Sequence, residues 1–170
     1  MTTGSAFDAL FQPGGDLLWG LIERIENRSW RVDRIKTLPP PTAALVRLAF
    51  LKTRYDNGGL LYVFECDHPA CGRAICDALA LVGLRAGAKV LTRAFDLFPS
   101  QADYDDWDRR FATIARLRKK FDHLDRALGA SVAAIEEAAA GYIRTHRQEF
   151  EHLRKRRPYH PLEDCYGEPG

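Results

Sequence analysis

Cysteine and histidine have the clearest capacity for chemistry in this chain, because both bind zinc and both act in nucleophilic catalysis. Three of the four cysteines lie close together in the sequence with one histidine, at Cys66, His68, Cys71 and Cys76. Zinc knuckles space their cysteines roughly two to four residues apart. Side chains five residues apart on a helix instead point about 140° away from each other. We therefore expect reduced, buried thiols, no metal site and no cofactor.

Catalytic groups are not indicated elsewhere in the sequence. Nothing near Cys71 and His68 marks an oxyanion site for a nucleophile. Paired carboxylates, a phosphate-binding loop and a nucleophile elbow are also missing from the sequence. We expect no catalytic residues and no enzymatic activity.

A further histidine, His146, falls on the apolar face of a predicted helix beside Tyr142, Ile143 and Phe150. A single histidine in that position is typical of a hydrogen-bonded core residue. The alternative is a partnership with Asp125, which would be structural before it was catalytic.

Basic side chains gather near the C-terminal end, in the run Arg154, Lys155, Arg156 and Arg157. Residues 144–157 hold six basic and two acidic residues, a net charge of +4; the other nineteen basic and twenty-one acidic residues leave −2. Such a run binds nucleic acid in some proteins. It also suits a solvated helix end, since cations are favoured at the C-terminus of the helix dipole. A nucleic-acid-associated protein using helix 144–157 is our alternative interpretation.

The elements that position these residues are predicted to be helices. Apolar residues recur at spacings of three and four, and no strand alternation is convincing. We predict an all-α fold, a single compact bundle of about seven helices around a central, buried helix at 42–56. Residues 60–65 should be helical, Gly129 should end one helix, and Ser131 should begin the last one. The helical domain spans residues 1–157, and the order of the tail at 158–170 is left open.

Two consecutive glycines interrupt this helical pattern at the end of the central helix, in Asp56-Asn57-Gly58-Gly59. Glycine and asparagine reach positive φ at low cost, so the segment predicts a helix end and a sharp reversal. One interpretation is architectural. The other is that the corner binds a partner or a small ligand, because a double glycine allows another chain to approach the backbone closely. The candidate binding residues are Tyr55, Asp56, Asn57, Gly58, Gly59 and Tyr62.

The order of these segments resembles the bacterial DNA-mimic-protein-like family. The resemblance rests on the segment 56–64, on Ala78–Gly83 and Ala88–Pro99, on Leu124-Asp125, and on the closing helix Tyr142–Phe150. It covers residues 45–150 and implies a helical domain, in a family most of whose members have no known function. Tyr62 stands where relatives usually carry Gln, and the Asn expected near Glu65 or Cys66 is absent.

The net charge of this chain does not fit the DNA mimicry for which that family is named. A mimic of duplex DNA needs negative charges spaced like phosphates, about one per 1.7 Å of axis. A body of net charge −2 with a basic end does not supply them. The resemblance therefore carries over the fold and not the mimicry.

The most economical function is a non-enzymatic protein-interaction module that binds another protein through the Asp-Asn-Gly-Gly corner; whether it is regulatory is left open. The first residues lack the features of a signal peptide, and no apolar run has the length of a membrane span. We expect a cytoplasmic protein without membrane contact. The partner and the oligomeric state do not follow from the sequence.

Overall fold

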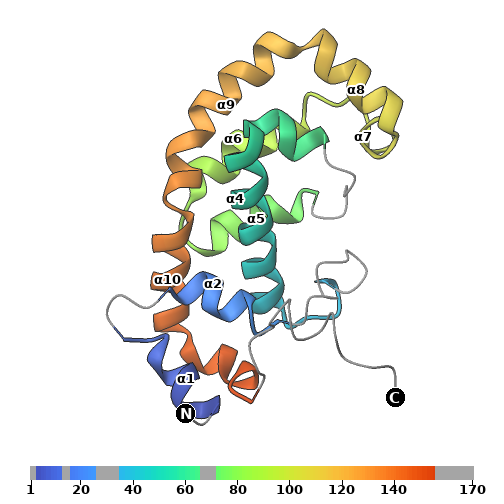
Figure 1. The fold of residues 1–170 in the computed structure, drawn as a ribbon. Coiled ribbons are helices and arrows are strands. Elements are labelled where there is room, and N and C mark those ends of the chain that lie inside the picture. Colours follow the sequence, from blue (N-terminus) through green and yellow to red (C-terminus); the bar gives the residue numbers. More distant parts are fainter. Residues whose placement is uncertain (1–2, 13–15, 26–34, 66–71, 156–170) are drawn as a thin grey trace.

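The computed structural model describes residues 3–12, 16–25, 35–65 and 72–155. These residues are all-α, as predicted, with no strand among them (Figure 1). The helices are α1 (Thr3–Ala9), α2 (Leu17–Ile22), α4 (Pro40–Glu65), α5 (Ala74–Leu81), α6 (Arg85–Phe95), α7 (Gln101–Asp105), α8 (Trp107–Arg116), α9 (Arg118–Ala133) and α10 (Ile135–Thr145), followed by the 3-10 helix η3 (Arg147–Leu153).

Helix α4 is the centre of the fold, as the apolar pattern of residues 42–56 predicted. It contacts α2, α5, α8, α9, α10 and η3. Its first half is almost entirely buried, and Leu45, Leu48 and Leu51 have no exposed surface. The helix begins at Pro40 rather than Thr42, because proline is tolerated in a first turn where its missing N–H needs no partner. Thr42 is instead fully buried, with its hydroxyl 3.2 Å from Nε2 of His152.

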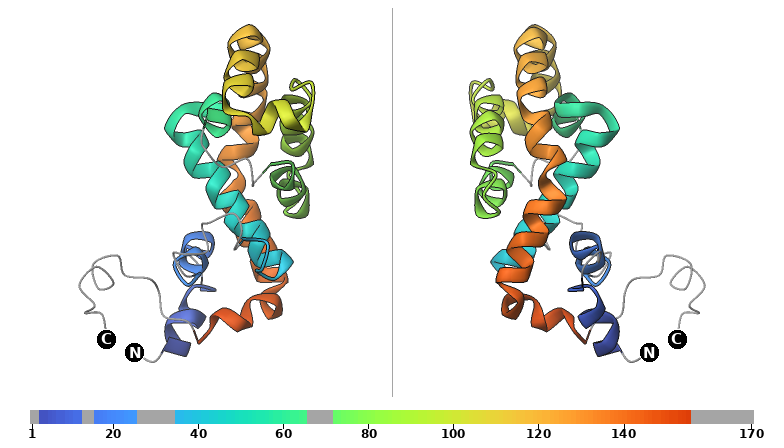
Figure 2. Two further views of the ribbon diagram at one scale, coloured as in Figure 1. Left: turned by 90° about the vertical axis from the view of Figure 1, so that its right-hand side faces the viewer. Right: turned by 90° about the vertical axis from the view of Figure 1, so that its left-hand side faces the viewer.

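Helices α9 and α10 follow one another along the length of α4 (Figure 1). The upper half of α9 lies between the second half of α4 on one side and α6 on the other (Figure 2). A shared aromatic cluster joins α4, α6 and α9 at this end. Its centre is Phe64, whose ring lies 5.0 to 6.0 Å from those of Phe95, Phe98, Tyr104 and Phe121.

The expected break at Gly129 is wrong, because α9 runs through Gly129 and Ser131 and ends at Ala133. The acidic stretch 103–108 is divided between α7 and α8. Asp106 ends α7 and caps α8, accepting a hydrogen bond from the backbone N–H of Arg109 at 2.9 Å. The described residues hold nine α-helices and one 3-10 helix, more than the about seven predicted.

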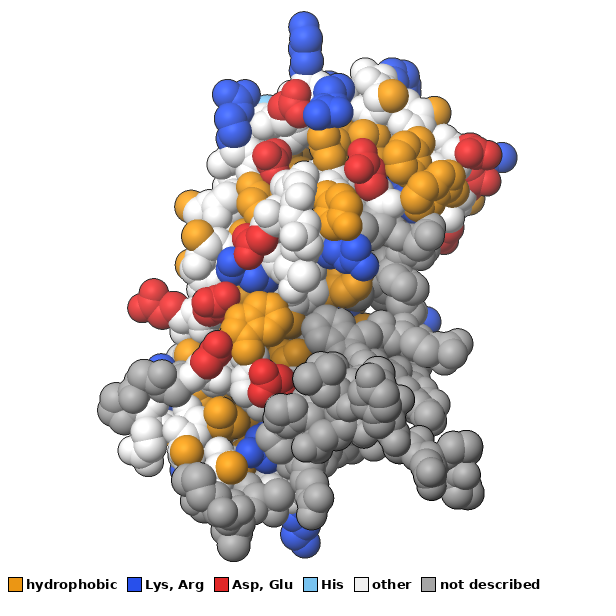
Figure 3. All heavy atoms as spheres, viewed as in Figure 1, with side chains coloured by type: hydrophobic (Ala, Val, Ile, Leu, Met, Phe, Trp, Pro, Cys, Tyr) orange, Lys and Arg blue, Asp and Glu red, His pale blue; other side chains and the backbone are white. Residues whose placement is uncertain are grey.

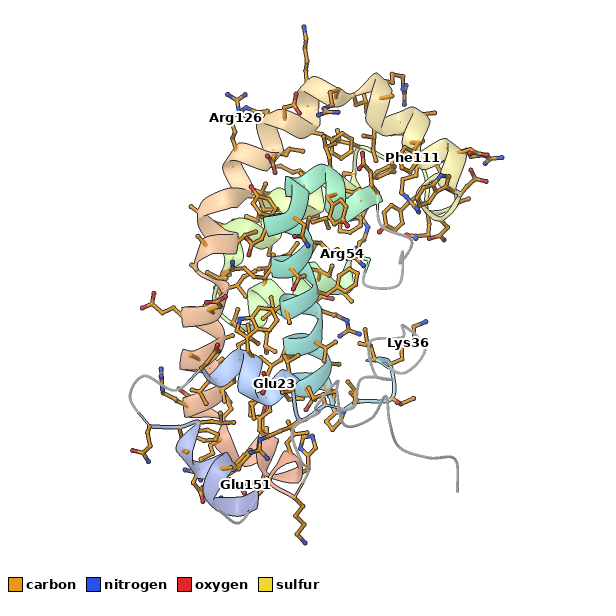
Figure 4. All side chains as sticks on the ribbon, in the orientation of Figure 1. Glu23, Lys36, Arg54, Phe111, Arg126 and Glu151 are labelled. Atoms are coloured by element: carbon orange, nitrogen blue, oxygen red, sulfur yellow. The ribbon has the colours of Figure 1, made fainter. Side chains whose placement is uncertain are left out.

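The two ends of the described chain meet at the pole opposite the aromatic cluster. Asp8 of α1 pairs with Arg147 and Arg154, the latter with Nη1 and Nη2 at 2.8 and 2.9 Å from the carboxylate oxygens. The guanidinium of Arg154 also lies 5.1 Å from the ring centroid of the buried Phe7. An ion-pair network therefore fastens α1 to η3, close to the labelled Glu151 in Figure 4.

Candidate interaction surface at the Asn-Gly-Gly corner

Helix α4 is kinked at the two glycines, whose backbones are not helical. Gly58 has an extended φ of −174°, which any residue adopts. Gly59 has φ 69° and ψ −163°, a region open essentially to glycine alone. The predicted reversal is therefore a kink, and the helical turn of residues 60–65 follows it as expected. Gly59 is the residue that the kink requires.

Asp125 of α9 holds the kink from inside. Its Oδ1 atom accepts a hydrogen bond from the backbone N–H of Leu60 at 2.7 Å, and its backbone carbonyl accepts one from the hydroxyl of Tyr55 at 2.8 Å. A Cβ atom on Gly59 would lie 2.9 Å from that Oδ1, so a side chain there would collide with the carboxylate. The inner side of the corner is filled by these contacts.

The phenol of Tyr55 is partly buried by these same contacts, and its pKa reflects that burial. Burial raises the pKa of Tyr55 to about 12, and the nearby Asp125 and Asp56 add to the rise because they disfavour a second negative charge. Tyr55 therefore stays protonated and keeps donating its hydrogen bond throughout the neutral range. Tyr55 and Gly59 are structural parts of the corner.

The outer side of the corner is polar and accessible. Asn57 and Gly58 are exposed, and the side chain of Asp56 is 52% exposed. Lys52, one turn earlier, forms an ion pair with Asp56 and lies 4.0 Å from Glu136 of α10. On the face in Figure 3, acidic and basic side chains are interspersed, and no dense band of negative charge is visible.

Tyr62 completes this outer side on the far flank of the kink. The guanidinium of Arg54 lies 5.5 Å from the Tyr62 ring centroid and 5.0 Å from that of Phe50. Arg54 points out of α4 on the face shown in Figure 4. Tyr62 also packs over Gly58, where an added Cβ would lie 2.8 Å from Cβ of Tyr62. The half-buried Tyr62 is thus held in place from two sides.

The six predicted residues are therefore contiguous but divided between two roles. Tyr55 and Gly59 belong to the inner contacts, whereas Asp56, Asn57, Gly58 and part of Tyr62 reach the surface. Sequence reasoning missed Lys52, Arg54 and Glu136. The four-residue spacing of Lys52 and Asp56 is a recognisable helical ion pair, but nothing local connects Glu136 to the corner.

The cysteine and histidine candidates for a metal or catalytic site are not supported by the described residues. Cys66, His68 and Cys71 lie outside the described residues. Cys76 is buried, and that burial raises the pKa of its thiol. In the ranges that the structure describes, no group of three or more His, Cys, Asp and Glu side chains is placed to hold a metal ion.

His146 makes the expected local hydrogen bond, but it is half-buried rather than part of the core, and it follows the last residue of α10. Its Nδ1 atom lies 2.9 Å from the backbone oxygen of Tyr142, and the two rings stack with centroids 4.1 Å apart. The alternative partner, Asp125, uses its carboxylate at the corner instead.

The basic run is partly occupied within the protein. Arg154 is bound to Asp8 and Glu151, so its charge is compensated internally. Lys155 is exposed, and Arg156 and Arg157 lie outside the described residues. Residues 147–153 form η3 rather than a continuation of α10. Nucleic-acid binding through residues 144–157 stays a prediction, with Arg154 unsuited to it.

Within the described segments, no helix has both the length and the apolar character needed to cross a bilayer.

A family model described as DMP19-like protein matches residues 36–146, which confirms the resemblance inferred from the corner and the order of helices. No curated protein matches the chain. No solved structure matches it either.

Proposed function

The chain belongs to the DMP19-like protein family, and we propose that it is a non-enzymatic interaction module that binds another protein through the outer side of the corner. We call this region the corner face and define it by Lys52, Arg54, Asp56, Asn57 and Tyr62. The ion pair of Lys52 and Asp56 lies on one flank of α4, and Arg54 with Tyr62 lies on another. The proposal retains the expectation of a cytoplasmic protein and leaves open whether the interaction is regulatory.

The observation that supports it most directly is the division between the inside and the outside of the corner. Asp125 and Tyr55 fix the backbone from within, while Asp56 and Asn57 remain accessible outside. A surface that is already rigid loses little conformational freedom on binding, which favours affinity. The corner face thus combines preorganisation with exposed polar groups.

The composition of the corner face indicates the kind of contact it makes. Asp56 and Asn57 offer a carboxylate and an amide, and Arg54 presents a guanidinium stacked on aromatic rings. Arginine and tyrosine are enriched at residues that dominate binding energy in protein interfaces. With Lys52 and Arg54 among its members, the corner face is mixed in charge. Such a surface suits an ordinary protein partner. It does not suit the DNA-binding site of another protein, which would require dense negative charge.

Affinity capture from native lysate tests this function. The test variant is Asp56→Ala/Asn57→Ala, which removes exposed groups and leaves the Asp125 contacts intact. The matched control is Asp77→Ala/Gln148→Ala, which removes an exposed carboxylate and an exposed amide on α5 and η3. We expect a partner that the wild type and the control recover and the test variant loses. Recovery of the same proteins by all three, with equal urea unfolding midpoints, would contradict the proposal.

A further inference from the structure

A second surface lies on the other side of α9 from the corner, between the end of α6 and the beginning of α9. It is a groove of about 370 Å³ lined by Arg93, Leu97, Lys119, Lys120, His123 and Leu124. Leu124 and Asp125 are neighbours on α9, and the helix lies between α6 and the second half of α4 (Figure 2). The groove and the corner face are therefore separate surfaces.

The packing of α6 against α9 explains where the groove forms. The two helices approach closely at Gly87, where an added Cβ would lie 2.5 Å from Cβ of Ser131. At the other end of the pair, the larger side chains of Leu97 and Leu124 are only partly buried against the core. They form an aliphatic floor that is left open to solvent.

The rim of this floor is cationic. Arg93, Lys119 and Lys120 are all exposed, and no carboxylate lines the groove. The acidic side chains nearest in sequence are engaged elsewhere, because Asp96 pairs with Arg73 at 2.7 Å and Asp122 with Arg118 at 3.2 Å. Within the described part of the chain, none of the three rim cations forms an ion pair. The groove thus carries three uncompensated positive charges around an apolar floor.

We propose that this groove docks an acidic amphipathic segment of a partner protein, with an apolar side chain on Leu97 and Leu124 and carboxylates on the three cations. The charge of the rim is complementary to that segment, and such complementarity steers association and selects partners. Nucleic acid fits less well, because single strands stack their bases on aromatic side chains and this floor is aliphatic. The proposal is independent of the corner face.

Fluorescence anisotropy tests the docking with a fluorescein-labelled, fourteen-residue helical peptide rich in Glu and carrying two Leu residues four apart. We expect saturable binding to the full chain that weakens as NaCl is raised, because salt screens exposed charges. Replacing the two Leu residues of the peptide by Ser, or its Glu residues by Lys, should abolish binding. Both changes leave the protein itself unaltered.

Protein variants then assign the binding to the groove. Lys119→Glu/Lys120→Glu should weaken peptide binding roughly tenfold or more, as expected when interfacial charge pairs become repulsive. Arg85→Glu/Arg144→Glu makes the same change of charge on exposed residues outside the groove and should bind the peptide like the wild type. Asp56→Ala/Asn57→Ala should also bind normally, which separates this proposal from the corner face.

Three results would overturn the proposal. The first is the absence of saturable peptide binding, and the second is an equal loss of affinity in the two charge-reversed variants. The third is that a twenty-nucleotide single-stranded DNA binds more tightly than the peptide and that this binding depends on Lys119 and Lys120. That result would assign the cations to nucleic acid.

Discussion

Oδ1 of Asp125 lies 2.7 Å from the backbone nitrogen of Leu60, a residue sixty-five positions earlier in the chain. The second part of α4 begins here, after the kink, and the first N–H groups of a helix have no partner within the helix. Asp125 supplies that partner from α9. One side chain thus caps a helix and joins the central helix to its neighbour.

Asp125→Ala should lower the free energy of unfolding by about 1–3 kcal/mol, because it leaves the N–H of the fully buried Leu60 without an acceptor. Asp125→Asn keeps an oxygen acceptor and should cost less. Urea unfolding followed by circular dichroism measures both variants. Equal stability of Asp125→Ala and the wild type would show that the cap contributes nothing.

Gly59→Ala should also destabilise the protein, by about 1–3 kcal/mol for the unfavourable backbone region alone, and its Cβ would press on Asp125. Gly141 is the matched control. It lies in α10 with open space around the position of a Cβ atom, so Gly141→Ala should raise stability by about 0.5–1 kcal/mol. The two variants should shift the urea midpoint in opposite directions, and a stabilising Gly59→Ala would refute the assigned role.

Tyr55 should make stability fall in strong alkali. Its pKa is raised by folding to about 12 from about 10 in the unfolded chain. Its contribution is therefore complete below pH 10 and is lost as the pH rises through the folded value. In Tyr55→Phe, the free energy of unfolding should fall less steeply over that window. Identical pH profiles for the variant and the wild type would contradict the enclosure of the phenol.

Asp8 should make stability fall in acid. Its hydrogen bonds to Arg154 and Arg147 lower the pKa of the Asp8 carboxyl below its usual value. The stabilisation is therefore present above the unfolded pKa, about 3.9, and is lost as the pH falls through the lower folded value.

The measurement for Asp8 is the difference in urea midpoint between the wild type and Asp8→Asn. That difference should be full at neutral pH and disappear in strong acid, whereas the exposed Asp77→Asn should behave like the wild type throughout. A difference that persists unchanged in acid would rule out the ion pairs as its source.

The sequence predicted the helices correctly where the spacing of apolar residues was regular. It did not predict where the helices begin and end. Gly129 looked like a helix break, yet a Cβ atom there would lie 3.2 Å from the Tyr55 hydroxyl. Ser131 looked like a cap, yet it lies inside α9 opposite Gly87. Both small residues serve contacts between helices, which local sequence does not reveal. Asp16, by contrast, is an ordinary local cap: it precedes α2 and accepts a hydrogen bond from the Trp19 N–H at 3.3 Å.

The corner was located from its two glycines, because few other residues can adopt the backbone of Gly59. Its neighbours in space were harder to predict. From the sequence, Asp125 was named as part of a Leu-Asp element and as the alternative partner of His146, not as a contact of the corner, and Glu136 was not singled out. Both come from helices far along the chain, and their proximity depends on how α9 and α10 pack against α4.

Photo-crosslinking in living cells tests the corner face most directly. Asn57 is replaced by p-benzoylphenylalanine in one variant, and the exposed Asp77 is replaced by it in the control. The proposed function predicts a covalent adduct with one particular protein from position 57 and none with that protein from position 77. Equal adducts from both positions, or adducts from position 77 alone, would contradict it.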